Sequence, residues 1–319
     1  MDRKQYTVAV WCITYNQKEF IKDALNGFIM QKTNFPFVVI VHDDKSTDGT
    51  TDIILDYAQK YPDIIIPVIE TENQWSKGGL KHIINIMNNR FRIGKYIAFC
   101  EGDDYWIVPD KLQKQFDIMS QDSEISLVHT GFFCVDESGM KIDRPVCEKY
   151  MRISETGYRF FPLLKKGNHI MTLTVMVRRN IYNSSFYQDC SIKIDYSLFL
   201  TASVMGKIAY IKERTSCYRN NPNSMINTIH DRVNKWLIIT RYEFIKMFLD
   251  GKIENKYIDR PFATRLFCIR ALCRYDNKYY IPILKSYPQY IAPFIVIYSM
   301  RFIRKLMKLP CVLEKNASN

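Results

Sequence analysis

Apolar runs and amphipathic segments alternate through the first third of the chain. Short runs rich in β-branched and aromatic residues are typical of buried strands, whereas apolar residues that recur every three or four positions are typical of helices. The pattern predicts a helix at 18–30 and strands at 6–13, 37–41, 64–69 and 96–100. Regular alternation of strands and helices indicates an α/β protein whose mostly parallel sheet is covered by helices.

Polar residues follow three of these predicted strands. Thr14-Tyr15-Asn16 follows the first, Asp43-Asp44 the second and Asp103-Asp104 the fourth. Ligands of such sheets bind beyond the carboxyl ends of the strands, so we expect these side chains to share one site. Asn16 followed by Glu19 also predicts a capping box at the start of the first helix. The sequence contains neither G-x-G-x-x-G nor a Walker A loop, which removes the usual support for NAD or ATP binding.

The stretch 96–106 is an apolar strand that runs into Glu101, Asp103 and Asp104. Adjacent carboxylates repel each other, and hard divalent cations such as Mg²⁺ or Mn²⁺ take oxygen ligands that they share with a substrate's phosphates. The stretch therefore has two interpretations. It is either a metal–diphosphate site at a strand end, or an acidic turn in which Asp104 or Asp110 caps the next helix.

The composition is that of a globular protein, with 47% hydrophobic and 24% charged residues among 319. A chain of this length can bury a large core and hold more than one folding unit. Its nine cysteines are scattered and include no C-x-x-C pair, which predicts buried, reduced thiols rather than a disulfide framework or a zinc site. The first residues lack the apolar core of a signal peptide, so we expect a cytoplasmic protein.

The net charge of +12 is concentrated in the last part of the chain. Residues 231–319 contain 17 Lys or Arg against 7 Asp or Glu, which indicates an anionic partner surface, either membrane or nucleic acid. The uncharged run 286–300 is shorter than the roughly 20 residues that span a bilayer. Basic residues at helical spacing follow it: Arg301, Arg304, Lys305 and Lys308. We expect these basic helices to attach the protein peripherally to the inner face of the membrane, with no nucleic acid partner; packing against the protein itself is the alternative.

Three blocks of the sequence resemble family 2 glycosyltransferases with the GT-A fold. They are 9–16 (AVWCITYN), 42–50 (HDDKSTDGT) and 101–106 (EGDDYW). The blocks stand in the family's order and at its spacing, and the resemblance is clear over 6–121 and fainter to 224. It implies a Rossmann-like, mixed but mostly parallel sheet flanked by helices. Beyond the resemblance, the aromatic-rich final third is itself expected to form a C-terminal helical extension.

The resemblance also implies how the chain is divided. A nucleotide-sugar-binding half would span 1–122, and an acceptor-binding half of the same GT-A domain would span 123–230. Residues 231–319 would form the basic helical region beyond that domain.

Donor-binding roles follow from the same resemblance. Tyr15, between Thr14 and Asn16, matches the residue that stacks on the donor's base, and Asp44 matches the carboxylate that accepts a hydrogen bond from the uracil ring. Both residue types suit these roles, since a planar ring covers a base and a carboxylate accepts from an N–H. A core aromatic and a turn residue are the structural alternatives. Lys77 or Lys81 is the candidate for a phosphate contact, and a solvated lysine is the alternative.

The resemblance assigns the chemistry to three acids. Asp103 matches a contact to the ribose side of the donor, and Asp104 matches the ligand of a Mn²⁺ or Mg²⁺ ion held against the diphosphate. Asp195 precedes an apolar helical segment and matches the family's catalytic base. It is favoured over Asp189, which has a more polar setting, and a helix N-cap is its structural alternative. Asn221 stands where relatives often have a metal- or phosphate-binding His, which implies weak metal binding without donor.

We therefore predict an inverting glycosyltransferase. Asp195 would deprotonate an acceptor hydroxyl, which attacks the anomeric carbon of a nucleotide sugar, a UDP-sugar by resemblance, while the metal-bound diphosphate leaves. The acceptor is expected to be a glycan or a lipid-linked saccharide. Two other classes remain: a sugar nucleotidyltransferase, which can share the sheet and the metal, and a non-catalytic module that binds sugar or nucleic acid.

Overall fold

The computed structural model describes residues 6–90, 93–221, 229–253 and 285. The chain divides into two compact units, Met1–Thr240 and Arg241–Asn319. The three-part division at 122 and 230 stays a prediction. In the described parts, no helix has both the length and the apolar character needed to cross a membrane. The basic segment 301–308 lies outside the described residues, and so does the run that precedes it.

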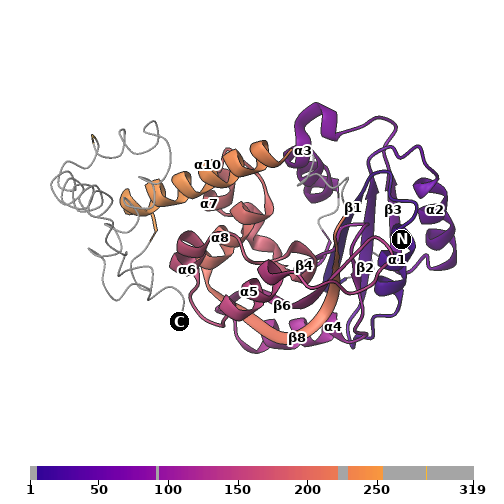
Figure 1. Cartoon of the computed structure of the whole chain (residues 1–319), viewed down its shortest axis with the longest axis horizontal. Coiled ribbons are helices and arrows are strands. Elements are labelled where there is room, and N and C mark those ends of the chain that lie inside the picture. Colours follow the sequence, from indigo (N-terminus) through magenta and orange to yellow (C-terminus); the bar gives the residue numbers. More distant parts are fainter. Residues whose placement is uncertain (1–5, 91–92, 222–228, 254–284, 286–319) are drawn as a thin grey trace. The chain divides into compact units, whose positions relative to one another are not determined.

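A mixed eight-stranded sheet forms the centre of the first unit (Figure 1). Its strand order is β3-β2-β1-β4-β7-β6-β8-β5, and the first four of these strands are parallel. The parallel half consists of β1 (Val8–Thr14), β2 (Phe37–Asp43), β3 (Ile65–Ile69) and β4 (Tyr96–Phe99). The other half consists of β5 (Tyr105–Trp106), β6 (Ile125–Val135), β7 (Met176–Arg178) and β8 (Lys207–Arg219). The predicted α/β fold and its four strands are confirmed.

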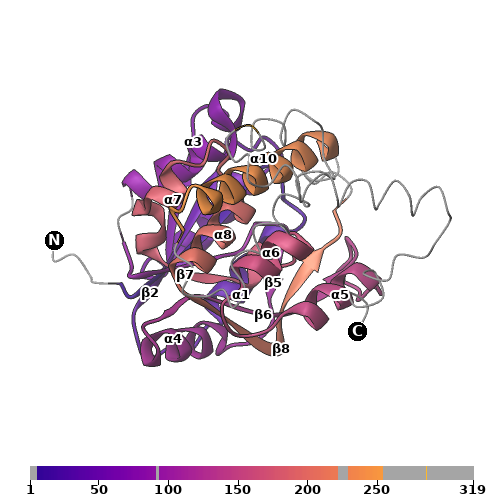
Figure 2. The ribbon, with the colours of Figure 1, turned by 90° about the vertical axis from the view of Figure 1, so that its left-hand side faces the viewer.

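Helices connect the strands and cover the sheet (Figure 1 and Figure 2). Those of the first half are α1 (Ile21–Ile29), α2 (Thr50–Lys60), α3 (Trp75–Arg90) and α4 (Lys111–Gln121). Those of the second half are α5 (Pro145–Ile153), α6 (Phe160–Lys166), η1 (Thr172–Thr174), η2 (Arg179–Asn183), α7 (Ser185–Gln188) and α8 (Asp195–Met205). A further helix, α10, runs over His230–Leu249.

The register of the parallel strands determines where the polar residues meet. β1 and β2 are buried along almost their whole length, as parallel strands covered on both faces are. Their pairing sets Thr14 opposite Asp43, and β1 pairs with β4 up to Trp11 and Phe99. The residues that follow each of these strands therefore reach the same edge of the sheet, as the sequence predicted.

The capping box predicted at Asn16 is wrong. Helix α1 begins only at Ile21, and its N-cap residue, Phe20, makes no side-chain capping bond. Asn16 lies instead in the left-handed region with φ of 51°, which asparagine tolerates better than most residues. Its Oδ1 accepts from the N–H of Thr47 at 2.8 Å, and its own N–H donates to Ser46 Oγ at 2.8 Å. Asn16 therefore joins the loops that follow β1 and β2.

The prediction of reduced thiols is wrong for one pair of cysteines. Cys134 in β6 and Cys147 in α5 form a disulfide, whereas Cys12, Cys100 and Cys217 are free and buried. The turn after β6 reverses the chain and returns it alongside the strand, as shown by the 2.9 Å bond from the N–H of Ile142 to the carbonyl of Cys134. Spacing alone gave no indication of this pairing.

We expect Gly27→Ala to destabilise the protein. A Cβ at Gly27 would stand 2.9 Å from both the backbone nitrogen and the backbone oxygen of Trp106 in β5. Alanine favours a helix by about 1 kcal/mol over glycine, but overpacking against backbone that cannot move aside costs about 1–3 kcal/mol. Urea unfolding should therefore give a lower free energy of unfolding than wild type. Lys22→Ala, on the exposed side of α1, is the control; a Gly27→Ala protein as stable as this control would contradict the close packing.

Candidate active site

The turn between β4 and β5 carries three carboxylates, on Glu101, Asp103 and Asp104, and we call residues 101–104 the acid turn. Its glycine lets it lie against the end of β1. The N–H of Gly102 donates to the carbonyl of Ile13 at 3.1 Å. A Cβ at this position would stand 2.7 Å from Thr14 Oγ1 and 2.4 Å from Gln17 Oε1, so a larger residue would push the acid turn away.

The two aspartates of the acid turn have different surroundings. The Asp104 side chain is only 4% exposed, and its Oδ1 accepts from the backbone N–H of Arg219 at 2.8 Å. Asp103 is more exposed than Asp104. Its Oδ2 accepts from Asn221 Nδ2 at 3.3 Å, and the amide of Gln17 also bonds to its carboxylate. Asp103 therefore presents the more accessible carboxylate, held between two neutral amides.

Burial and mutual repulsion act on all of these acids. Burial raises the pKa of Asp104 well above its usual value, with contributions from Asp103 and Glu101. Burial also raises the pKa of Glu101 to about 8, and the charges of Asp103 and Asp195 add to this effect. Within the described ranges, no lysine or arginine side chain forms an ion pair with any of these carboxylates. The charge of Arg219 lowers the pKa of Asp103 and Asp104, but burial outweighs it. The site thus gathers carboxylates that the described side chains offset only in part.

Arg219, at the end of β8, is the residue that connects the elements around the acid turn. Its side chain is 2% exposed, and it donates to Asp23 Oδ2 at 2.6 Å and to the carbonyl of Asp103 at 2.9 Å. The guanidinium lies between the rings of Phe20 and Tyr105, at 4.8 and 5.2 Å from their centroids. Sequence reasoning gave Arg219 no role, although an arginine at the end of a long, partly apolar segment was a signal that could have found it.

Tyr15 and Asp44, the predicted base-binding residues, lie in different environments. Tyr15 is 49% exposed, so it is not a core aromatic and one face can receive a planar ligand. Asp44 is 2% exposed, and its two oxygens accept from the backbone N–H groups of Gln74, at 2.5 Å, and Trp75, at 3.0 Å. Asp44 therefore anchors the start of α3, and its contact with a base stays a prediction.

The other two predicted donor-binding side chains have local partners. Thr14 Oγ1 donates to Gln17 Oε1 at 2.7 Å, beside the acid turn. Lys77 forms an ion pair with Glu72, and both side chains are largely exposed. This is the setting of a solvated lysine, and a phosphate contact by Lys77 stays a prediction.

Asp195 reaches the same site from the second half of the chain. It is the first residue of α8, and Ile194, not Asp195, is the N-cap. The carboxylate accepts from the N–H of Tyr196 at 2.6 Å and from Asn168 Nδ2 at 3.0 Å. Burial raises its pKa, and its charge acts on Glu101. Asp189 is exposed at the end of α7.

The acids supply part of a metal site. In the parts of the chain that the structure describes, no three His, Cys, Asp or Glu side chains are arranged to hold a metal ion. Asp103 and Asp104 offer carboxylate oxygens, which suit a hard cation such as Mg²⁺ or Mn²⁺. These ions usually complete their shell with water and substrate phosphates. The donor set therefore fits an ion that is bound together with a diphosphate.

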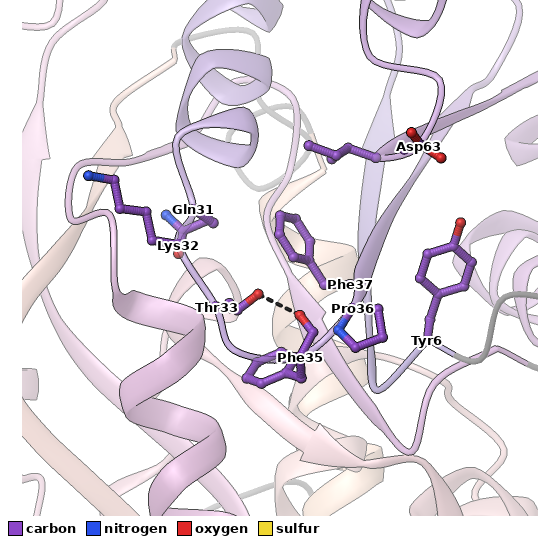
Figure 3. Close-up of a pocket in the computed structure, with 9 residues that line it drawn as sticks. Tyr6, Gln31, Lys32, Thr33, Phe35, Pro36, Phe37 and Asp63 are labelled. Carbon is purple, nitrogen blue, oxygen red and sulfur yellow. Dashed lines mark hydrogen bonds between the residues drawn. The ribbon is translucent and has the colours of Figure 1, made fainter.

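A hollow of about 430 Å³ lies away from these acids (Figure 3). Its residues lie at the amino ends of β1, β2 and β3, which is the opposite edge of the sheet from the acid turn. They are Tyr6, Gln31, Lys32, Thr33, Phe35, Pro36, Phe37, Asp63 and Ile64. None of the predicted site residues lines this hollow, and we do not assign the function to it.

Relatives of known sequence share most of the chain. A protein of unknown function from Mycobacterium tuberculosis is 31% identical over 233 residues, which cover 72% of this chain. The match spans 63% of that relative's length. TuaG of Bacillus subtilis, whose name associates it with teichuronic acid biosynthesis, is 28% identical over 75% of this chain and 86% of its own.

Solved structures share the fold at low sequence identity. A fragment of S. aureus TarS in complex with UDP-GlcNAc has a TM-score of 0.53 and 16% identity, covering 83% of this chain and 81% of its own. The mannosyltransferase PcManGT from Pyrobaculum calidifontis, in complex with GDP-Man and Mn²⁺, has a TM-score of 0.50 and 16% identity, covering 96% of this chain and 88% of its own. The structural neighbours are GT-A glycosyltransferases.

The family model for Glycosyl transferase family 2 matches residues 10–185. The match covers more than half of the chain and includes most of β1, the acid turn and β7. Together with the glycosyltransferase relatives and the shared fold, it shows that this chain belongs to glycosyltransferase family 2.

Proposed function

We propose that the chain transfers a sugar from a nucleotide donor, a UDP-sugar, to a hydroxyl of a glycan or lipid-linked saccharide, with inversion at the anomeric carbon. The observation that carries the proposal is the set of buried carboxylates at the end of β4, none of which has an ion-paired cation among the described residues. An exposed Tyr15 lies beside them, and Asp195 lies on the same side. TarS with UDP-GlcNAc supports a UDP donor, and TuaG supports a role in polysaccharide biosynthesis.

The donor would bind along the carboxyl ends of β1, β2 and β4. Its base would stack on Tyr15, whose neighbours in the chain, Thr14 and Asn16, would flank the base. Asp44 would accept a hydrogen bond from the ring N–H. Asp103 would contact the ribose side, and Lys77 would approach a phosphate if it left Glu72. The support for this placement is the common edge that these residues share and the exposure of Tyr15.

Mn²⁺ or Mg²⁺ would be held by Asp104 together with Asp103. Asp103 has the more accessible carboxylate, while Asp104 is buried and bonded to the backbone of Arg219. When bound, the ion would neutralise charge on the departing diphosphate. The amide of Asn221, which donates to Asp103, supplies no metal ligand in the way a histidine would, so we expect the site to fill together with the donor.

Asp195 would act as the general base. Its carboxylate would take the proton of the acceptor hydroxyl, whose oxygen would form a bond to the anomeric carbon. The bond from that carbon to the diphosphate would break, and the nucleoside diphosphate would leave with the bonding electron pair. The raised pKa of Asp195 suits a base, because a carboxylate that holds a proton more strongly removes one more effectively.

The proposed function is tested by incubating the full chain with UDP- and GDP-sugars, Mn²⁺ and a panel of saccharide acceptors. We expect release of nucleoside diphosphate that depends on the acceptor. Release of pyrophosphate from a sugar phosphate and a nucleoside triphosphate would indicate a nucleotidyltransferase instead. Binding of saccharide with neither product would indicate a non-catalytic module.

We predict that Asp103→Asn and Asp104→Asn each weaken Mn²⁺-dependent binding of UDP by at least about tenfold, since each removes an anionic oxygen from the proposed ion. Titration calorimetry with and without Mn²⁺ measures this. Asp52→Asn, which removes the same charge at an exposed position of α2, is the control. Wild-type UDP affinity in either acid-turn variant would remove that residue from the proposed metal site.

We predict that Asp195→Asn lowers the rate of transfer by roughly 10²-fold or more, because asparagine cannot accept the proton. The affinity for UDP should change little, since the proposed role is toward the acceptor. Asp189→Asn serves as the control. An equal loss of UDP affinity would move Asp195 to donor binding, and a loss of thermal stability alone would support a structural role.

We further propose that the basic segment at Arg301, Arg304, Lys305 and Lys308 binds anionic membrane surfaces. Each basic residue near such a surface contributes on the order of 1 kcal/mol, so changing all four to Gln should abolish sedimentation with phosphatidylglycerol vesicles at low salt. The control changes four exposed lysines elsewhere to Gln: Lys22, Lys81, Lys149 and Lys212. Equal loss in both variants, or no binding by wild type, would contradict a role of this segment.

A further inference from the structure

We propose that Asn168 is a positioning residue for Asp195, which orients the carboxylate and holds it ionised for proton transfer. The inference rests on the proposed function, because it takes Asp195 as the group that receives the acceptor's proton. It concerns a residue that no sequence motif singled out and that lies 27 positions before Asp195.

The hydrogen bonds around Asp195 define the orientation of its carboxylate. Asn168 Nδ2 donates to Oδ2 at 3.0 Å, and the backbone N–H of Tyr196 donates to Oδ1 at 2.6 Å. The hydroxyl of Thr172 stands 3.5 Å from Oδ2. Asn168 Oδ1 accepts from the N–H of Ile170 at 3.3 Å, so the amide must turn its NH₂ group toward Asp195. With a donor on each oxygen, the carboxylate is held in one rotamer.

The segment that carries Asn168 is itself fixed to the acid turn's end of the sheet. It starts at Gly167, which has a φ of 84° that few other residues adopt. His169 Nδ1 bonds to the Gly167 carbonyl at 2.9 Å. Further on, the carbonyl of Leu173 accepts from Trp106 Nε1 at 2.9 Å, and Trp106 lies two residues after Asp104. The residue that holds the proposed base is therefore coupled to the elements that carry the acid turn.

A neutral amide is suited to this task. Burial raises the pKa of Asp195, while the bonds from Tyr196 and Asn168 lower it. An arginine or lysine in the same place would stabilise the charge more strongly and leave a weaker base. An amide donor opposes the effect of burial on the pKa of the carboxylate without placing a cation beside it.

Other titratable groups lie on the elements around α8. Among the described residues, Glu101 is the one whose pKa shift includes a contribution from the charge of Asp195. Burial lowers the pKa of His129 to about 3 and also lowers that of His169, so both are neutral at pH 7. The charged and titratable residues on or beside these elements are Glu101, His129, Lys165, Lys166, His169, Arg179, Tyr182, Tyr187, Lys193, Lys207, Tyr210, Lys212, Glu213, Arg214, Cys217, Tyr218 and Arg219.

The test is the pH dependence of nucleoside diphosphate release by wild type, Asn168→Asp and Asn168→Ala. Activity requires ionised Asp195, so the rate falls as pH falls through its pKa. Loss of the amide donor raises that pKa, and an aspartate at 168 adds a repelling charge. We expect the acidic limb of the pH–rate profile, where the rate falls at low pH, to move to higher pH. The shift should be about one unit or more for Asn168→Asp and smaller for Asn168→Ala. The donor KM should change less than about twofold.

Three further measurements separate this role from others. Asn85→Asp, which adds the same charge on the exposed side of α3, should leave the limb unchanged. In a Glu101→Gln background the shift caused by Asn168→Asp should persist; if it vanishes, the limb belongs to Glu101 and the proposal is overturned. The proposal is also overturned if the acidic limb of the pH–rate profile does not shift. This includes the case in which turnover falls at every pH and the unfolding midpoint falls with it, because a purely structural residue would behave in this way.

A readout without catalysis distinguishes this inference from the proposed function. Carboxyl ¹³C NMR titration, with Asp195→Asn to assign the signal, should show the same rise in pKa in Asn168→Asp. A shifted signal in a protein that releases no nucleoside diphosphate from any donor would refute the transferase and leave the Asn168–Asp195 coupling. An unshifted signal in an active enzyme would refute the coupling and leave the transferase.

Discussion

Repulsion among buried carboxylates is the constraint on which the rest of this site depends. Glu101, Asp103 and Asp104 follow one strand directly, and Asp195 adds a fourth charge from another element. Burying these carboxylates away from water costs free energy, and their mutual repulsion adds to the cost; both effects appear as the raised pKa values of Glu101 and Asp104. A fold under selection for stability alone would place a lysine or arginine among them. The absence of such an ion pair from the described contacts supports the proposed cation that binds together with the donor.

The protein keeps these acids in place with neutral or distant groups. Amide side chains or backbone N–H groups hold Asp103, Asp104 and Asp195. Arg219 bonds to Asp23 and to backbone carbonyls and forms no ion pair with the carboxylates of the acid turn among the described contacts. Its charge lowers the pKa of Asp103 and Asp104, but burial outweighs this effect and both pKa values are raised. Because neutral donors hold the carboxylates of the acid turn, their oxygens stay available for the proposed ion while their geometry stays rigid.

The fold was predictable because its signals are local. Apolar runs and polar strand ends specify parallel strands with ligand residues at one edge, and the register of Thr14 against Asp43 shows this edge directly. The acid turn and Tyr15 were predictable for the same reason, since strand order in an α/β sheet brings successive strand ends together. Asp195 was predictable only through the family resemblance, because nothing near it in the sequence connects it with β4.

Tertiary structure decided which polar groups pair with one another, and these pairings could not be predicted from the sequence. Asn16 could cap its own helix or join a neighbouring loop, and only the approach of the loop after β2 settled the choice. Cys134 and Cys147 are brought together by a reversal of the chain that spacing does not encode. Asn168 and Arg219 acquire their roles from partners far away in sequence. The sequence by itself determined the strands, the helices and the edge where the acids gather, because these depend on periodicity; the contacts that orient each acid depend on packing between distant segments, which only the folded chain defines.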